Sequence, residues 1–238
     1  MKEYIKLPKV NKLSDSRSKL RELNDASWKN YIFFHLLQFY KETDNSEIVE
    51  LIFKEKQKKK AEIEKEIKKR LKKWLKEDQR FCLNGFLVNR EPSSDGAIDG
   101  FYDLKFEHSD WINKYFAFEC KNLDKSSGSI NEYVYNRTQQ DGGVYRYMIN
   151  KYAEDLDFGG MLGFVIEDES NLIIGKIIEK IHKTFDNNDI GQLTGRCIIE
   201  HSIENNSNTF DSIHLRLEEN KIKKHIFTLH HIIMAFMS

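Results

Sequence analysis

Residues 115–123 read Tyr-Phe-Ala-Phe-Glu-Cys-Lys-Asn-Leu and place two charged residues, Glu119 and Lys121, at the end of an apolar stretch. The run is short, apolar and aromatic on its N-terminal side, which predicts a β-strand. Successive side chains of a strand point to opposite faces, so Glu119 and Lys121 share one face while the phenylalanines and Cys120 share the other. The stretch therefore predicts a core strand that carries a carboxylate and an ammonium group side by side.

A buried acid and base usually lose more by desolvation than their attraction returns, so this pair points to a third charge, such as a metal ion. A second apolar segment lies upstream, at residues 102–106, and places Asp103 opposite to Leu104 and Phe106 in alternation. The polar residues 108–110 join the two segments. We expect a hairpin that brings Asp103 close to Glu119 and Lys121.

An aspartate followed at some distance by Glu-x-Lys on an apolar strand resembles the PD-(D/E)xK nuclease superfamily. The residues that carry the resemblance are Asp103 (or Asp99), Glu119 and Lys121. The resemblance implies an α/β restriction-endonuclease-like core, that is, a central mixed sheet flanked by helices, here with an N-terminal helical extension. It also implies a metal-dependent nuclease that hydrolyses phosphodiester bonds.

The resemblance further implies a role for each site residue. Asp103 and Glu119 would bind Mg²⁺ (or Mn²⁺) together with the backbone carbonyl of Cys120, since hard cations take oxygen ligands. Asp99 is the alternative aspartate. Lys121 would orient the attacking water and stabilise charge on the phosphoryl group. In the following helix, Gln139, Gln140, Tyr145 and Arg146 are candidates to reach the phosphate, and Glu42 or Glu47 are candidates for an extra acidic residue from an N-terminal helix.

The order of the predicted elements agrees with this resemblance. Periodicity predicts helices over 26–40, 47–76 (one helix or a pair), 131–152 (in two parts) and 170–185. It predicts strands over 81–88, 102–106, 115–123, 159–166, 197–199, 212–217 and 225–237. We expect residues 1–79 to be an N-terminal helical region with a basic amphipathic helix and residues 80–238 to be the nuclease core.

The segment from Lys54 to Lys76 is the most basic part of a chain that has 38 basic and 38 acidic residues. One interpretation is a surface that contacts nucleic-acid phosphates, with Lys58, Lys59, Lys69 and Arg70 as candidate contacts beside Tyr145 and Arg146. The other is a solvated helix face. A non-catalytic nucleic-acid-binding or scaffold protein that acts through residues 54–76 is therefore the alternative to a nuclease.

Composition and missing motifs narrow the function classes. Three widely spaced cysteines fit a reducing compartment and exclude an ordinary zinc finger or ribbon. The N-terminus lacks the apolar core of a signal peptide, and no segment is apolar over a bilayer's width, so we expect a cytoplasmic protein without a membrane partner. No Gly-x-x-x-x-Gly-Lys loop is present, so any motor would be a separate subunit. We expect DNA as the partner ahead of RNA, and a homodimer would allow both strands of a duplex to be cut. By analogy with other small nucleases of the superfamily, we expect a role in restriction or anti-phage defence.

Polar residues in the C-terminal strands have two interpretations. The adjacent His230 and His231 face opposite ways in a strand and are expected to be satisfied core histidines rather than metal ligands. Ser212, His214 and Arg216 share one strand face and either contact substrate or face water.

Overall fold

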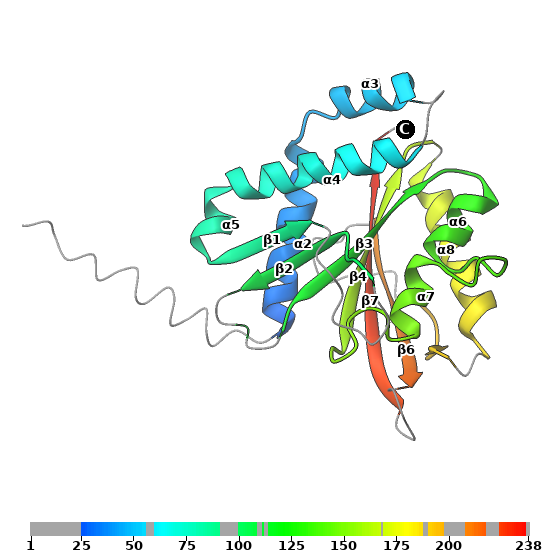
Figure 1. Ribbon diagram of the computed structural model, residues 1–238. Coiled ribbons are helices and arrows are strands. Elements are labelled where there is room, and N and C mark those ends of the chain that lie inside the picture. Colours follow the sequence, from blue (N-terminus) through cyan, green and yellow to red (C-terminus); the bar gives the residue numbers. More distant parts are fainter. Residues whose placement is uncertain are drawn as a thin grey trace, which may run out of the picture.

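The computed structural model describes residues 25–55, 60–90, 100–108, 111, 114–167, 169–187, 190–197, 208–217 and 224–236. They form an α/β fold in which a seven-stranded mixed sheet is flanked by helices (Figure 1). The helices are α2 (Asp25–Glu42), α3 (Ser46–Glu55), α4 (Lys60–Glu77), α5 (Gln79–Leu83), α6 (Ser127–Tyr133), α7 (Gly143–Met148) and α8 (Ser170–Phe185). The strands are β1 (Phe86–Arg90), β2 (Leu104–His108), β3 (Phe116–Leu123), β4 (Phe158–Val165), β5 (Gln192–Leu193), β6 (Thr209–Leu217) and β7 (Lys224–Ala235).

The sheet order is β1-β2-β3-β4-β7-β6-β5. Strands β1, β2 and β3 form an antiparallel meander, which confirms the expected hairpin of β2 and β3. Strand β4 then pairs in parallel with β3 after a crossover through α6 and α7, and β7 pairs in parallel with β4. All eight residues of β4 are buried, as expected for a strand covered on both faces.

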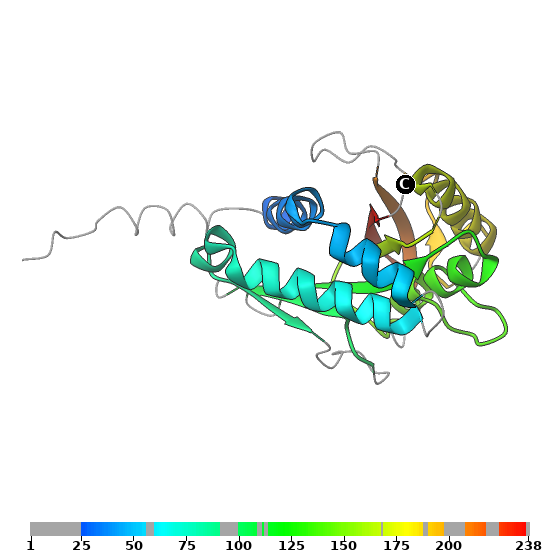
Figure 2. The ribbon, with the colours of Figure 1, turned by 90° about the horizontal axis from the view of Figure 1, so that it is seen from above.

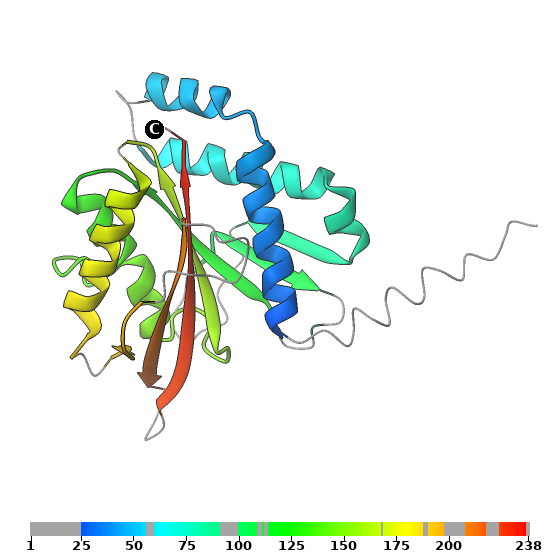
Figure 3. The ribbon, with the colours of Figure 1, turned by 180° about the vertical axis from the view of Figure 1, so that it is seen from behind.

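Two hydrophobic clusters cover the two faces of the sheet. The first unites α2, α3, α4 and α5 with side chains such as Phe116 and Phe118, and the second unites α6, α7 and α8 with side chains such as Ala117 and Leu123. Figures 2 and 3 show α2 and α8 on opposite sides of the sheet. The alternation predicted for β3 is therefore correct, and Glu119 and Lys121 lie on the face covered by α6 and α7. Because the helices before residue 80 share a core with the strands, residue 80 does not separate two independently packed units.

The structure corrects several predicted boundaries. Residues 79–83 form helix α5 rather than the start of a strand, and the turn at Gly85, with a φ of 85°, leads into β1. A short apolar run such as Phe81-Cys-Leu fits either structure, and packing of Phe81 in the first cluster decides for the helix. The predicted helix over 131–152 is two short helices with a turn between them, and β5 was not predicted. Of the strand predicted at 197–199, only Cys197 lies within the described residues, and it is not in a strand.

A buried hydrogen-bond chain crosses the second cluster. His214 Nδ1 lies 3.0 Å from the carbonyl of Gly191, and His214 Nε2 lies 2.9 Å from Ser212 Oγ. Ser212 Oγ is 2.9 Å from His231 Nε2, and His231 Nδ1 is 3.0 Å from the hydroxyl of Tyr133. A carbonyl only accepts, so His214 Nδ1 carries the hydrogen and each later donor is fixed in turn. Both rings are neutral donors and acceptors, and the hydroxyl of Tyr133 donates at the far end of the chain.

These contacts answer the two open questions on the C-terminal strands. Ser212, His214 and Arg216 are completely buried, so they neither contact substrate nor face water. His230 and His231 are both buried, which confirms them as core histidines. His231 has a partner at each ring nitrogen, as predicted, whereas His230 bonds Asp211 at 2.8 Å through Nδ1 and its Nε2 makes no hydrogen bond within the described residues.

Burial of His214 predicts a dependence of stability on pH. Desolvation lowers its pKa from 6.5 to about 4, so the folded protein binds fewer protons than the unfolded chain between these values. The free energy of unfolding should therefore fall as pH decreases from about 6.5, by on the order of 3 kcal/mol at pH 4 for this group alone. His214→Asn keeps a donor for Gly191 and cannot titrate. Denaturant melts at pH 7, 6 and 5 should show a shallower decline for the variant, and equal declines would contradict the assignment.

Candidate active site

The site forms where strand β2 stops pairing with β3. The last paired residues are Leu104 and Phe118, and Asp103 lies at a bend just before β2. Its Oδ2 accepts a hydrogen bond from the backbone N–H of Cys120 at 2.7 Å. The carboxylate thus extends the β2–β3 ladder by one position beyond Leu104, the first residue of β2. In a strand, the N–H and C=O of one residue point to the same edge, which places the carbonyl of Cys120 on the Asp103 side as well. At this edge of β3, the backbone N–H and C=O of Cys120 therefore lie beside the carboxylate of Asp103.

Glu119 is the buried centre of the site, with 1% of its surface exposed. One oxygen, Oε1, accepts from Lys121 Nζ at 2.5 Å and from Arg146 Nη1 at 2.7 Å. Burial raises the pKa of Glu119, the charge of Lys121 opposes this, and the charge of Asp103 raises the pKa further. Lys121 and Arg146 together compensate the buried negative charge of Glu119, and losing both would leave this charge without a partner.

Helix α4 contributes Glu64 and Lys68, which sequence reasoning missed. Lys68 Nζ lies 2.5 Å from Asp103 Oδ1 and 3.2 Å from Glu64 Oε1, one helical turn away. Burial raises the pKa of Glu64, with the charge of Lys121 acting against it, so Glu64 also faces the β3 residues. In the sequence, Glu64 and Lys68 border the buried stripe of Ile63, Ile67 and Leu71 at a spacing of four, a pattern that the edge of an ordinary solvated helix also shows.

The two acidic residues proposed for the N-terminal helical region lie elsewhere. Glu42 is exposed at the end of α2, and Glu47 on α3 pairs with Arg70 at 2.5 Å. Glu64 on α4 is an acidic residue of the N-terminal helices that does line the cavity with Lys121.

Arg146, one of the residues expected to reach the phosphate, contacts Glu119 from α7 and is held by a second carboxylate. Its Nε and Nη2 donate to the two oxygens of Asp141 at 2.8 and 2.6 Å. The guanidinium lowers the pKa of Asp141 to about 2. The chain next to Asp141 passes close to Val134, and only glycine fits there, because a Cβ on Gly142 would lie 2.6 Å from the carbonyl oxygen of Val134. The pair fixes Arg146 as a bridge between Asp141 and Glu119.

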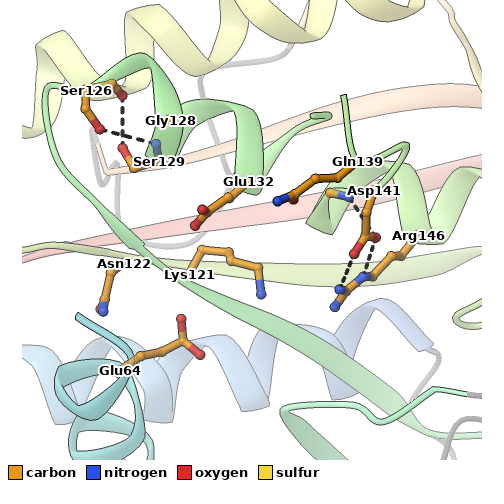
Figure 4. A pocket seen from close by; sticks show the side chains of 11 residues that line it. Glu64, Lys121, Asn122, Ser126, Gly128, Ser129, Glu132, Gln139, Asp141 and Arg146 are labelled. Carbon is orange, nitrogen blue, oxygen red and sulfur yellow. Dashed lines mark hydrogen bonds and ion pairs between the residues drawn. The ribbon is translucent and has the colours of Figure 1, made fainter. Parts of the chain in front are cut away.

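Of these residues, Glu64, Lys121, Asp141 and Arg146 line a cavity of about 520 Å³, whereas Asp103, Glu119 and Lys68 are not among its lining residues. Figure 4 shows the ammonium of Lys121 inside it, between Glu64 on one wall and Glu132, Gln139 and Arg146 on the other. The wall at α6 is fixed by its N-cap, where Ser126 accepts from the backbone N–H of Ser129 at 3.3 Å, and where Asp124 accepts from the hydroxyl of Ser129 at 2.9 Å. The cavity thus exposes polar groups of α4, β3, α6 and α7, and of the loop between α6 and α7, to one space.

Other predicted site residues lie outside this cavity. Gln140 is exposed with a φ of 52°, and its neighbour Gln139 lines the cavity instead. Tyr145 packs on Tyr135, with ring centroids 4.5 Å apart. Lys69 pairs with Glu66 at 3.4 Å, and Arg70 with Glu47, on the outer side of α4. Asp99, Lys58 and Lys59 lie outside the described residues.

The donor set fits a small hard cation that keeps most of its water. Within the described residues, no three His, Cys, Asp or Glu side chains converge closely enough to hold a metal by themselves. Mg²⁺ typically needs only one or two carboxylates and retains several waters. Asp103, Glu119 and the carbonyl of Cys120 meet that requirement. The carboxylate oxygens are now bonded to Lys68, Lys121 and Arg146, so a cation would compete with these ion pairs.

Comparisons with family models, with curated proteins and with solved structures gave no match. No helix in the part of the chain that the structure describes is long and apolar enough to cross a membrane.

Proposed function

We propose that this protein is a metal-dependent nuclease that hydrolyses phosphodiester bonds, with DNA as its substrate, on a restriction-endonuclease-like core. The observation that carries the proposal is the meeting of Asp103, Glu119 and Lys121 at the point where β2 leaves β3. The order of the elements supports the restriction-endonuclease-like core as well. A helix is followed by three antiparallel strands, then by the crossover helices and a parallel strand. Glu64, from the helix that precedes the strands, adds a third carboxylate beside them.

Asp103 and Glu119 would hold Mg²⁺ or Mn²⁺ with the carbonyl of Cys120. When bound, the cation polarises a phosphate oxygen and lowers the pKa of a coordinated water. The chain itself contributes two carboxylates in fixed orientations. The N–H of Cys120 orients Asp103, and the side chains of Lys121 and Arg146 orient Glu119.

Lys121 acts as a charged donor in this mechanism. The neighbouring carboxylates Glu119, Glu64 and Asp103 raise its pKa above the ordinary value, so it stays protonated at neutral pH. A protonated lysine does not remove a proton from water. It donates hydrogen bonds to the attacking oxygen and to the phosphoryl oxygens, where negative charge grows in the transition state. Arg146 holds Glu119 from the other side through its own anchor on Asp141.

A non-catalytic nucleic-acid-binding protein is the second candidate, because the same ion pairs neutralise the carboxylates without any metal. In this case the ion pairs would be permanent, and substrate would be bound without cleavage. The two candidates differ in whether a divalent cation binds the site.

Thermal melting with Mg²⁺ or Mn²⁺ separates them. A cation that binds only the folded protein stabilises it by about 2.7 kcal/mol at a concentration of 100 times Kd. We expect a rise in Tm for the wild type and none for Asp103→Asn. Asp155→Asn, at an exposed position, is the matched control and should respond like the wild type. Equal rises in all three proteins would show that the cation binds elsewhere.

A further inference from the structure

A second groove, of about 300 Å³, lies between α6 and α8. Four lysines line it, and Glu179 is the one acidic residue among its lining residues, which are Lys125, Ser127, Ile130, Asn131, Lys176, Glu179, Lys180 and Lys183. Lys176, Lys180 and Lys183 recur at spacings of four and three, so they share one face of α8. Figure 1 shows α6 and α8 side by side along this face.

The described residues that line this groove carry more positive than negative charge, four lysines against Glu179. Lys176 Nζ donates to the carbonyl of Lys125 at 3.3 Å, and within the described residues none of the four forms an ion pair. Lys180 has its pKa lowered by burial and by the charge of Lys183. On α4, by contrast, Lys69 pairs with Glu66 and Lys73 pairs with Glu77. Concentrated positive charge without acidic partners favours an anionic ligand.

The groove adjoins the candidate active site. Ser126, Gly128 and Ser129 line the cavity that holds Lys121, whereas Lys125, Ser127 and Ile130 line the lysine groove. The two spaces are therefore the two sides of a single turn of chain, at the start of α6. A polymer with regularly spaced negative charges can cross this turn and occupy both.

We propose that the groove between α6 and α8 binds the phosphodiester backbone of the nucleic acid whose reacting phosphate lies in the candidate active site. This inference rests on the proposed function and names a surface that extends it. The lysines would neutralise phosphates without regard to sequence. The binding path then runs from the cavity over the N-terminus of α6 and along α8.

Salt dependence of binding tests this path. The affinity of wild type, Lys180→Gln/Lys183→Gln and the control Lys41→Gln/Lys114→Gln is measured by fluorescence anisotropy, in EDTA to prevent cleavage. The probes are a labelled 30-nucleotide single-stranded DNA and its duplex. Both variants lose the same charge, and the control lysines are exposed, Lys41 on α2 and Lys114 just before β3.

For single-stranded DNA, two lost phosphate contacts should make the slope of log K against log salt shallower by about 1.4. The loss of affinity between 50 and 200 mM salt would then be about sevenfold smaller for the groove variant than for the wild type. The control should keep the wild-type slope. A change on the duplex alone would identify the double-stranded form as the ligand of the groove, and a change on the single strand alone would identify the single-stranded form.

Equal slopes for the groove variant and the control would overturn the inference, as would a wild type that binds neither probe. Cleavage by the wild type is recorded separately. Cleavage by the wild type together with an unchanged slope in the groove variant would support the proposed nuclease and reject the groove as a binding surface. A shallower slope in the groove variant without cleavage by the wild type would support the groove and reject the proposed nuclease.

Discussion

Lys121→Met should retain the fold and reduce nuclease turnover by roughly 10²–10³-fold, the usual cost of removing one preorganised donor from a transition state. The methionine keeps the length and the apolar stem of the lysine, and Arg146 remains to pair with the buried Glu119. We expect the loss in kcat rather than in substrate affinity, because Lys121 acts where charge develops during the reaction. Single-turnover cleavage at saturating protein measures this directly.

The matched control is Lys54→Met, which removes an exposed lysine paired with Glu50 on α3. It should leave kcat unchanged. If Lys121→Met cleaves at the wild-type rate while its Tm is unchanged, Lys121 has no role in the reaction and the mechanism is wrong.

Arg216→Met should destabilise the protein by about 4 kcal/mol or more, among the largest effects of any single substitution here. Arg216 is completely buried on β6, and its pKa is lowered by desolvation to about 10, so it remains charged at neutral pH. Its guanidinium donates to His225 and to five backbone carbonyls of the α7–β4 connection, at Tyr147, Tyr152, Ala153, Glu154 and Leu156. Methionine would leave these carbonyls without their donor, each at a cost of roughly 1–3 kcal/mol before relaxation.

Urea denaturation of the wild type, Arg216→Met and the control Arg196→Met checks this expectation. Arg196 is exposed, so its replacement should change the free energy of unfolding by less than about 0.5 kcal/mol. Arg216→Lys should fall between the two, since an ammonium offers three donors in place of five. A loss below about 1 kcal/mol in Arg216→Met would mean that water replaces the guanidinium.

The sequence was sufficient for the part of the site that depends on local periodicity. Alternation along β3 predicted that Glu119 and Lys121 share a face, and the polar connection to β2 predicted the hairpin that brings Asp103 to Cys120. The pairing of β2 with β3 and the 2.7 Å hydrogen bond that the N–H of Cys120 donates to Asp103 confirm the hairpin, and the 2.5 Å contact of Lys121 with Glu119 confirms the shared face. These features need only neighbouring residues, so they are readable without tertiary structure.

What the sequence did not reveal depends on distant partners. Glu64 and Lys68 fit an ordinary solvated helix until α4 is placed across β3, where Lys68 meets Asp103 from 35 residues away. The partners of Arg216 are backbone carbonyls 60 to 69 residues away, apart from His225, and a carbonyl has no signature in an amino-acid sequence. Short apolar runs were ambiguous for a different reason, since residues 81–83 fit a strand or a helix and only packing decides.

Cleavage of plasmid DNA, single-stranded DNA and RNA by the purified protein tests the central claim most directly. Each substrate is incubated with Mg²⁺, with Mn²⁺ or with EDTA, beside Lys121→Met and Lys54→Met. The account predicts cleavage of DNA by the wild type and by Lys54→Met with a divalent cation, none in EDTA, and little by Lys121→Met. Cleavage that persists in EDTA, or the absence of cleavage of all three substrates together with no metal-dependent rise in Tm, would contradict it.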